Sequence, residues 1–220
     1  MKDTRTPEEI CEVLIGEVVT LDVYGLKSLD FQPDVVFDLG ANMGVFARYA
    51  RTLFPAARII CVEPDPDNCA NFKRMTPDPN TILIRKAIGS GQVYRHPDAS
   101  NGAKESYVTA CTGYERVSGA LPAVPVDSIL PDALIAQYRK PGDRAIMKID
   151  IEGNDNAVWD HAPSMAAIRS LDYIAIEVHR CALTGDRIDA VNNLTRVALQ
   201  SFSPTHDCQE EHVIFTARKR

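Results

Sequence analysis

Several patterns that define common protein classes are missing from this 220-residue chain. Its six cysteines form neither a C-x-x-C pair nor a zinc-ligand spacing, which removes the usual sequence evidence for a zinc site. No apolar run approaches the roughly 20 residues that cross a membrane, and no apolar segment typical of a secretion signal follows the polar residues 1–5. We therefore expect no membrane contact, reduced thiols and a cytoplasmic location.

An excess of positive charge is missing as well. The chain has 24 Lys and Arg against 30 Asp and Glu, a formal net charge of −6 at pH 7. Nucleic-acid binders normally present a basic face, so this balance disfavours a nucleic-acid partner. Hydrophobic residues at 45% and charged residues at 25% suit one soluble globular domain with a sizeable core.

A glycine turn at residues 40–44 lacks the glycines of a dinucleotide-binding loop. A buried strand beginning at Val35 precedes it and a helical pattern follows, which is the first unit of an open α/β sheet. The G-x-G-x-x-G pattern would need glycines at positions that Asn42 and Val45 occupy, and the Gly-Lys-Ser/Thr ending of a P-loop is absent too. Asp38, at the end of the strand, would repel a phosphate and favour a cationic ligand.

A second carboxylate, Glu63, ends the next predicted strand about twenty residues after the turn. A carboxylate at this position suits two hydrogen bonds from ribose hydroxyls. A positively charged nucleoside without a pyrophosphate describes S-adenosylmethionine (SAM). We therefore assign Glu63 to the ribose, Asp38 and Gly40 to the methionine part of SAM, and Asn42 and Gly44 to the shape of the loop.

Two further predicted strands end in Asp150 and Glu177. Carboxyl ends of parallel strands share one edge of a sheet, so these two acids should converge with Asp38 and Glu63 on one crevice. Any single acid at a strand end more often caps a helix or forms a turn. Four on one edge favour a functional crevice.

Four segments of the chain resemble the FkbM family of SAM-dependent methyltransferases, and the likeness extends from about Val35 to His179. They are residues 35–44, 61–64, 147–153 (M-K-I-D-I-E-G) and 176–179 (I-E-V-H). The resemblance implies a single doubly wound, Rossmann-like α/β domain of the class I methyltransferase type. Its mostly parallel seven-stranded sheet would have an antiparallel last strand.

The resemblance also places parts of the chain around the cofactor. The insert at 90–121 would form a small β excursion over the cofactor. Residues 1–30 lie before the region of resemblance, and their helical pattern predicts an N-terminal lid over the sheet edge or, alternatively, part of the substrate entrance. Ala87 would lie beside the adenine. Members of the family typically methylate hydroxyls of sugars and other small natural products, which implies a small-molecule acceptor. The sequence leaves open whether the chain forms a homo-oligomer.

The periodicity of apolar residues predicts the remaining elements. One helix should carry Ile10, Val13, Leu14 and Val18 on its buried face, whereas residues 21–29 could be a hairpin or a loop. The expected helices cover residues 6–19, 45–53, 65–75, 154–161 and 186–200. The expected strands cover residues 35–38, 58–63, 81–85, 92–96, 107–112, 144–150, 171–179, 201–205 and 212–217.

Methyl transfer to an alcohol is helped by a group that takes the hydroxyl proton. His179 is the first candidate for this base because its unperturbed pKa lies near ~6.5, although a structural histidine would fit the position equally well. Asp150 would bind the substrate or orient the base. A Mg²⁺ or Mn²⁺ site from Asp150, Glu152 and His179 is conceivable but disfavoured, because the spacing does not specify it.

The stretch after the fourth strand favours oxygen as the methyl acceptor. Many methyltransferases that act on exocyclic amines carry Asn or Asp, two prolines and an aromatic there, whereas this chain has Asp-Ile-Glu-Gly at 150–153. Two other classes stay open. A nicotinamide-dependent oxidoreductase is weakened by the missing glycines, and a protein that binds SAM without catalysis is weakened by the intact acids.

Overall fold

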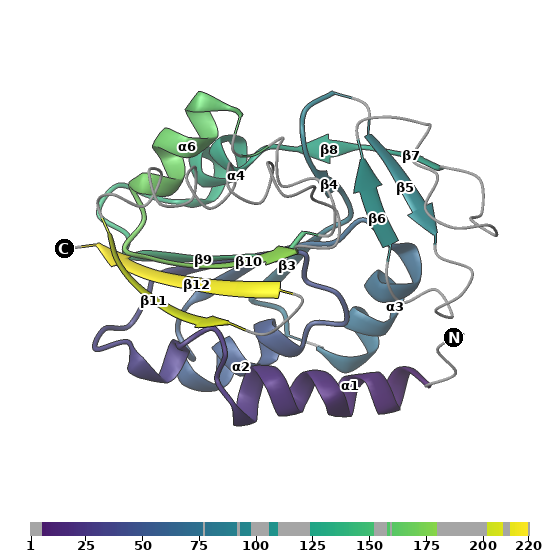
Figure 1. Ribbon diagram of the computed structural model, residues 1–220, viewed down its shortest axis with the longest axis horizontal. Helices are drawn as coiled ribbons and strands as arrows, with labels where there is room; N and C mark the ends of the chain where they lie inside the picture. The colour runs from purple at the N-terminus through teal and green to yellow at the C-terminus, as the bar shows by residue number, and fades with distance from the viewer. Residues whose placement is uncertain are drawn as a thin grey trace.

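Short runs rich in valine and isoleucine form the inner strands of one central sheet in the computed structural model (Figure 1). The structure describes residues 6–76, 78–91, 93–97, 106–109, 124–151, 158, 160–179, 202–208 and 212–219. The sheet has seven strands in the order β11-β12-β10-β9-β1-β2-β3. Their bounds are β1 Val35–Leu39, β2 Arg58–Val62, β3 Thr81–Ile84, β9 Ala145–Ile149, β10 Tyr173–His179, β11 Phe202–Cys208 and β12 His212–Lys219.

The first five strands of this sheet along the chain run parallel. β1 lies in the middle, and Val35 pairs in register with Arg58 of β2 and Ala145 of β9. β12 is antiparallel to both β10 and β11. The predicted α/β class with a mostly parallel sheet is therefore confirmed, and the last strand runs antiparallel as expected.

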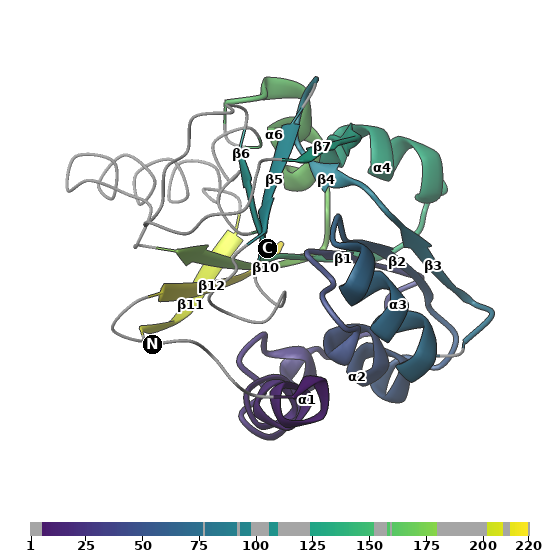
Figure 2. The same cartoon turned by 90° about the vertical axis from the view of Figure 1, so that its right-hand side faces the viewer.

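Helices cover both faces of the sheet (Figures 1 and 2). One layer contains α1 (Pro7–Ile15), the π-helix η1 (Gly16–Thr20), the short 3₁₀ helix η2 (Leu26–Ser28), α2 (Val45–Leu53) and α3 (Pro66–Met75). The other layer contains α4 (Pro131–Tyr138) and α6 (Ala162–Arg169), two helices that the sequence analysis did not predict.

The side chains of β1 alternate between two cores. Val35, Phe37 and Leu39 pack in the core that includes residues of α4 and α6, whereas Val36 packs in the core under α1 and α2. Successive side chains of a strand point to opposite faces, so Asp38 lies on the same face as Val36. This alternation decides the surroundings of the first strand-end acid.

The N-terminal helix begins where the sequence predicts. Thr6 and Glu9 form a reciprocal capping box, with Thr6 N donating to Glu9 Oε2 at 2.6 Å and Glu9 N donating to Thr6 Oγ1 at 3.2 Å. The predicted buried face is only partly correct, since Ile10 and Val18 are buried but Val13 is 43% exposed. From Gly16 the helix continues as the π-helix η1, so the segment that carries Val18 does not follow the unbroken α-helix that the prediction assumes.

Two smaller sheets accompany the central one. β5 (Val93–Pro97), β6 (Ser106–Thr109) and β7 (Val124–Val126) form an antiparallel sheet, and β4 (Ala87–Ile88) pairs in parallel with β8 (Ser128–Ile129). In Figure 1 the three-stranded sheet lies on the side towards which the arrowhead of β10 points. β5 and β6 correspond to the predicted strands at 92–96 and 107–112, with β6 shorter than expected.

The rest of the insert at 90–121, most of the predicted helix at 154–161 and all of that at 186–200 lie outside the described residues. Within the described ranges, no helix is both long and apolar enough to span a bilayer.

Candidate functional site

The turn between β1 and α2 depends on two glycines with left-handed backbone angles. Gly40 has φ +80°, and a β-carbon there would lie 1.7 Å from the carbonyl oxygen of Asp150. Gly44 has φ +86° at the N-terminus of α2, where a β-carbon would lie 2.7 Å from the ring of Phe72. Asn42, between them, also has a positive φ of +47°. The turn is therefore held tightly against both β9 and α3.

The Glu63 carboxylate is bound to this turn. Its Oε2 accepts a hydrogen bond from the backbone N–H of Asn42 at 2.8 Å, and its Oε1 accepts one from the N–H of Asp65 at 2.9 Å. The Nδ2 group of Asn68 donates to Oε1 at 3.4 Å. Burial raises the pKa of Glu63 to about 7, although these hydrogen bonds favour the charged form. Glu63 thus joins the glycine turn to the start of α3, and its assignment to a ribose stays a prediction.

Asp38 lies beneath the sheet edge and has no exposed surface. Its Oδ1 is 3.3 Å from Nζ of Lys148, which is 5% exposed. Burial raises the pKa of Asp38 above its ordinary value, and the ammonium group of Lys148 offsets part of this shift. Asp38 contacts Lys148 on the strand face that packs under the N-terminal helices, and its predicted place beside the methionine part of SAM stays a prediction.

Lys148 is the site residue that the sequence analysis missed. Its Nζ donates to the carbonyl oxygen of Gly40 at 2.8 Å and lies 3.1 Å from Oδ2 of Asp150. Burial alone would lower the pKa of Lys148, but the carboxylates of Asp150 and Asp38 outweigh it and raise the pKa. The available signal was a charged residue inside the otherwise apolar strand at 144–149. Lys148 therefore connects the turn, the buried acid and the edge acid.

Tyr24 brings the N-terminal segment into the same cluster. Its hydroxyl lies 2.8 Å from Oε2 of Glu177 and 3.1 Å from Oδ2 of Asp150. Its ring meets the ring of Phe46 edge to face, with centroids 5.4 Å apart. Burial raises the pKa of Tyr24 far above its ordinary value, and the two carboxylates add to the shift. The residue lies in the segment 21–29 for which the sequence left two structures open.

Asp150 and Glu177 therefore meet at the sheet edge, as the sequence predicts, through a shared tyrosine. The Asp150 side chain is 23% exposed, so it is accessible from solvent. His179 is the last residue of β10 and pairs in register with His212 of β12, but its side chain lies outside what the structure describes. The predicted Asp150–His179 pair stays a prediction.

The remaining predicted residues have different outcomes. Ala87 is fully buried in β4 and packs with Val93, so its place beside an adenine stays a prediction. Glu152, a candidate for a metal site, lies outside the described residues. Among the residues that are described, no group of three or more His, Cys, Asp and Glu side chains is arranged to hold a metal ion.

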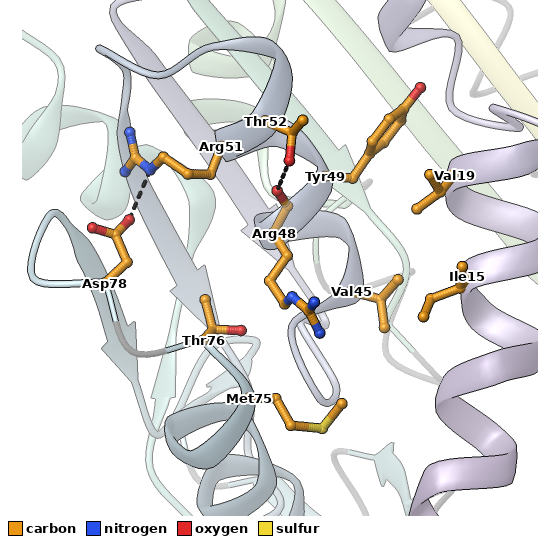
Figure 3. Close-up of a pocket in the computed structure, with 10 residues that line it drawn as sticks. All are labelled: Ile15, Val19, Val45, Arg48, Tyr49, Arg51, Thr52, Met75, Thr76 and Asp78. Carbon is orange, nitrogen blue, oxygen red and sulfur yellow. Dashed lines mark hydrogen bonds and ion pairs between the residues drawn. The ribbon is translucent and has the colours of Figure 1, made fainter.

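A pocket of about 490 Å³ opens elsewhere, between the N-terminal helices and α2 (Figure 3). The ion pair between Arg51 and Asp78, at 2.7 Å, lies at one side of it. None of its lining residues is a predicted site residue. They are Ile15, Val19, Val45, Arg48, Tyr49, Arg51, Thr52, Met75, Thr76 and Asp78.

Comparison with known proteins shows the fold. A putative rRNA methylase from Clostridium thermocellum has a TM-score of 0.55 and 9% identity, covering 91% of this chain and 94% of that one. A fibrillarin/Nop5p complex has a TM-score of 0.52 and 11% identity, and the match covers 91% of this chain and 81% of that one. The chain has the Rossmann-like fold of class I SAM-dependent methyltransferases. No family model matches the chain, so the FkbM resemblance is not shown.

A curated relative is a much longer protein. The AMB antimetabolite synthetase AmbE of Pseudomonas aeruginosa is 27% identical over 191 residues. These residues make up 82% of this chain but only 7% of the synthetase. The similarity therefore concerns a small part of that protein.

The predicted partners are corrected by the comparisons. We expected a small-molecule hydroxyl acceptor and no nucleic acid. The similar structures instead include a putative rRNA methylase and fibrillarin in complex with Nop5p, so the comparisons do not favour the expected small-molecule acceptor. The small-molecule acceptor was implied by the FkbM resemblance. The exclusion of nucleic acid relied on a net charge of −6 for the whole chain, and a total charge does not report the local surface beside a site.

Proposed function

We propose that the protein is a SAM-dependent methyltransferase. The observation that carries this proposal is the hydrogen bond from the Asn42 N–H to Oε2 of Glu63 at 2.8 Å. It joins the glycine turn after β1 to the acid after β2, the two places where a nucleoside binds at the edge of such a sheet. The turn has no G-x-G-x-x-G pattern, which supports a nucleoside ligand without a pyrophosphate.

The residues at the sheet edge would divide the work of binding. Glu63 would accept hydrogen bonds from the ribose hydroxyls, and the turn at 40–44 would lie against the methionine part. The negative charge of Asp150 and Glu177 would favour a cationic ligand. When bound, SAM supplies an activated methyl group, so these residues mainly have to align the acceptor and exclude water.

We propose transfer to an oxygen atom. The segment 150–153 lacks the prolines and aromatic residue that are typical of amine methylation. His179 would take the hydroxyl proton, and Asp150 would orient either His179 or the acceptor. Two similar structures are a putative rRNA methylase and a fibrillarin/Nop5p complex, so an RNA hydroxyl is the first acceptor class to test.

The test is transfer of a labelled methyl group. Purified protein is incubated with methyl-tritiated SAM and, separately, with total RNA and with total protein, each followed by ribonuclease or protease digestion. We expect label in RNA that ribonuclease releases, and a loss of about 100-fold in Asp150→Ala and in His179→Ala. Label in neither fraction would contradict a macromolecular acceptor. Unchanged transfer in both variants would contradict the assigned roles.

A further inference from the structure

We propose that Tyr24 is a positioning residue that fixes the distance between the carboxylates of Asp150 and Glu177, and with it the place of the methyl acceptor. This inference rests on the proposed function. A single hydroxyl group lies within hydrogen-bond distance of both carboxylates, at 3.1 Å from Asp150 Oδ2 and 2.8 Å from Glu177 Oε2. Asp150 directly follows β9, and Glu177 follows Ile176, the β10 residue that pairs with Ile149, so Tyr24 connects two neighbouring strands near the end of β9.

The position of the hydroxyl is determined by the rest of the tyrosine. The side chain is only 4% exposed, and its ring is held by the edge-to-face contact with Phe46. The hydroxyl of Tyr173, on β10, donates to the backbone carbonyl of Tyr24 at 2.8 Å. Ring and backbone are therefore both fixed, which is what a residue needs in order to set the geometry of others.

One hydroxyl has one proton, so it can donate to only one carboxylate at a time. The shorter contact, 2.8 Å, is to Glu177. Asp150 has the ammonium group of Lys148 at 3.1 Å from the same Oδ2 atom. A continuous chain of polar contacts thus runs from Lys148 through Asp150 and Tyr24 to Glu177. Removing the Tyr24 hydroxyl breaks this chain at its centre.

The chain of contacts continues into the buried part of the sheet. Lys148 reaches Asp38 on β1 at 3.3 Å, and its Nζ lies 5.5 Å from the centre of the Tyr24 ring. The N-terminal segment therefore supplies a side chain to the candidate site itself. An acceptor lying against Asp150 would have its position set by a residue more than a hundred positions earlier in the chain.

The test uses Tyr24→Phe, which removes one oxygen atom and keeps the ring that packs on Phe46. The matched control is Tyr49→Phe. The Tyr49 hydroxyl lies in the same helical layer and donates to Asp22 at 3.1 Å, not to Asp150 or Glu177. Hydrogen–deuterium exchange needs no ligand. We expect amide exchange at residues 175–178 at least about threefold faster in Tyr24→Phe, and unchanged in Tyr49→Phe. Equal exchange in both variants would overturn the proposal.

The catalytic consequence is measured separately, with tritiated SAM and total RNA. We expect the rate at saturating SAM to fall about 10- to 100-fold in Tyr24→Phe, while the Kd for S-adenosylhomocysteine changes less than about twofold. A purely structural role would lower the transfer rate and the affinity for S-adenosylhomocysteine together, and that result would overturn the proposal. Altered exchange in a protein without any methyl transfer would instead refute the proposed function and retain the positioning. If Tyr24→Phe does not fold, Tyr173→Phe loosens the same tyrosine through its backbone and serves as the second variant.

Discussion

Nζ of Lys148 lies 3.3 Å from Oδ1 of Asp38, and both side chains are almost completely removed from solvent. Transfer of two charged groups into a core costs free energy that only their mutual contact and hydrogen bonds offset. The additional bond from Lys148 to the carbonyl of Gly40, at 2.8 Å, ties this pair to the glycine turn. The pair therefore couples the stability of the fold to the geometry of the candidate site.

Removing the lysine from this pair should be strongly destabilising. Lys148→Met leaves Asp38 as a buried carboxylate without its ammonium partner, and we expect a loss of about 3–5 kcal/mol in the free energy of unfolding. Urea denaturation followed by circular dichroism measures this loss. A loss below about 1 kcal/mol would show that the pair is not buried as described.

Two variants serve as controls for the charge pair. Asp38→Asn combined with Lys148→Met removes both charges and should recover part of the lost stability. Arg74→Gln breaks an ion pair with Glu8 whose side chains are 58% and 65% exposed. Because solvent screens exposed pairs, this variant should lose less than about 1 kcal/mol.

The glycine turn predicts a contrast between two alanine substitutions. Gly40 and Gly142 both have left-handed backbone angles, φ +80° and +88°. A β-carbon at Gly142 meets nothing within 4 Å, whereas one at Gly40 would lie 1.7 Å from a backbone oxygen. Gly142→Ala should therefore lower the free energy of unfolding only by the cost of placing alanine in a left-handed conformation, about 1–2 kcal/mol. Gly40→Ala should lose about 4 kcal/mol or more, or fail to fold, as judged by soluble yield and unfolding midpoint. Equal losses would contradict the close approach of the Asp150 backbone to Gly40.

Glu63 predicts a defined pH dependence of stability. The pKa of Glu63 is raised from 4.5 to about 7 in the folded protein, chiefly by burial. Between these values the folded state holds a proton that the unfolded state has released, so this contribution is complete below pH 4.5 and is lost as the pH rises through about 7. The unfolding free energy of the wild type relative to Glu63→Gln should fall by up to about 3 kcal/mol over this range. A constant difference would contradict the raised pKa.

Removing the N-cap residue of α3 should reduce stability by a smaller amount. Oδ1 of Asp65 accepts hydrogen bonds from the backbone N–H groups of Asp67 and Asn68, at 2.8 and 3.1 Å. Asp65→Ala leaves these donors without the cap and should cost about 1–2 kcal/mol in thermal or urea unfolding. Asp67→Ala, two residues later in the first turn of α3, is the comparison and should cost less than half as much, since the Asp67 side chain is not the N-cap.

The sequence predicts those parts of the site that depend on local pattern. Asp150 and Glu177 each end an apolar run, and the rule that parallel strands end at one edge is sufficient to predict that they lie close together. The burial of Asp38 follows from which strand face it occupies. A carboxylate at a strand end has the same local pattern whether it faces the crevice or the core, so the sequence alone does not separate the two.

The residues that sequence reasoning missed depend on contacts between distant segments. Tyr24 reaches Asp150 across 126 positions, and the turn that carries it has no strong helical or strand pattern. Helix α4 was missed because it is only eight residues long and Leu130, its N-cap, makes no side-chain cap. Tertiary packing against the sheet stabilises both, and single-sequence periodicity does not report that packing.

The most direct test of the central claim is calorimetric titration of the protein with SAM, S-adenosylhomocysteine and NAD. We predict micromolar binding of the two adenosyl ligands, no heat from NAD, and at least about tenfold weaker adenosyl binding in Glu63→Ala. Binding of NAD alone, or adenosyl affinity that is unchanged in Glu63→Ala, would contradict the assignment of the glycine turn and Glu63 to a SAM site.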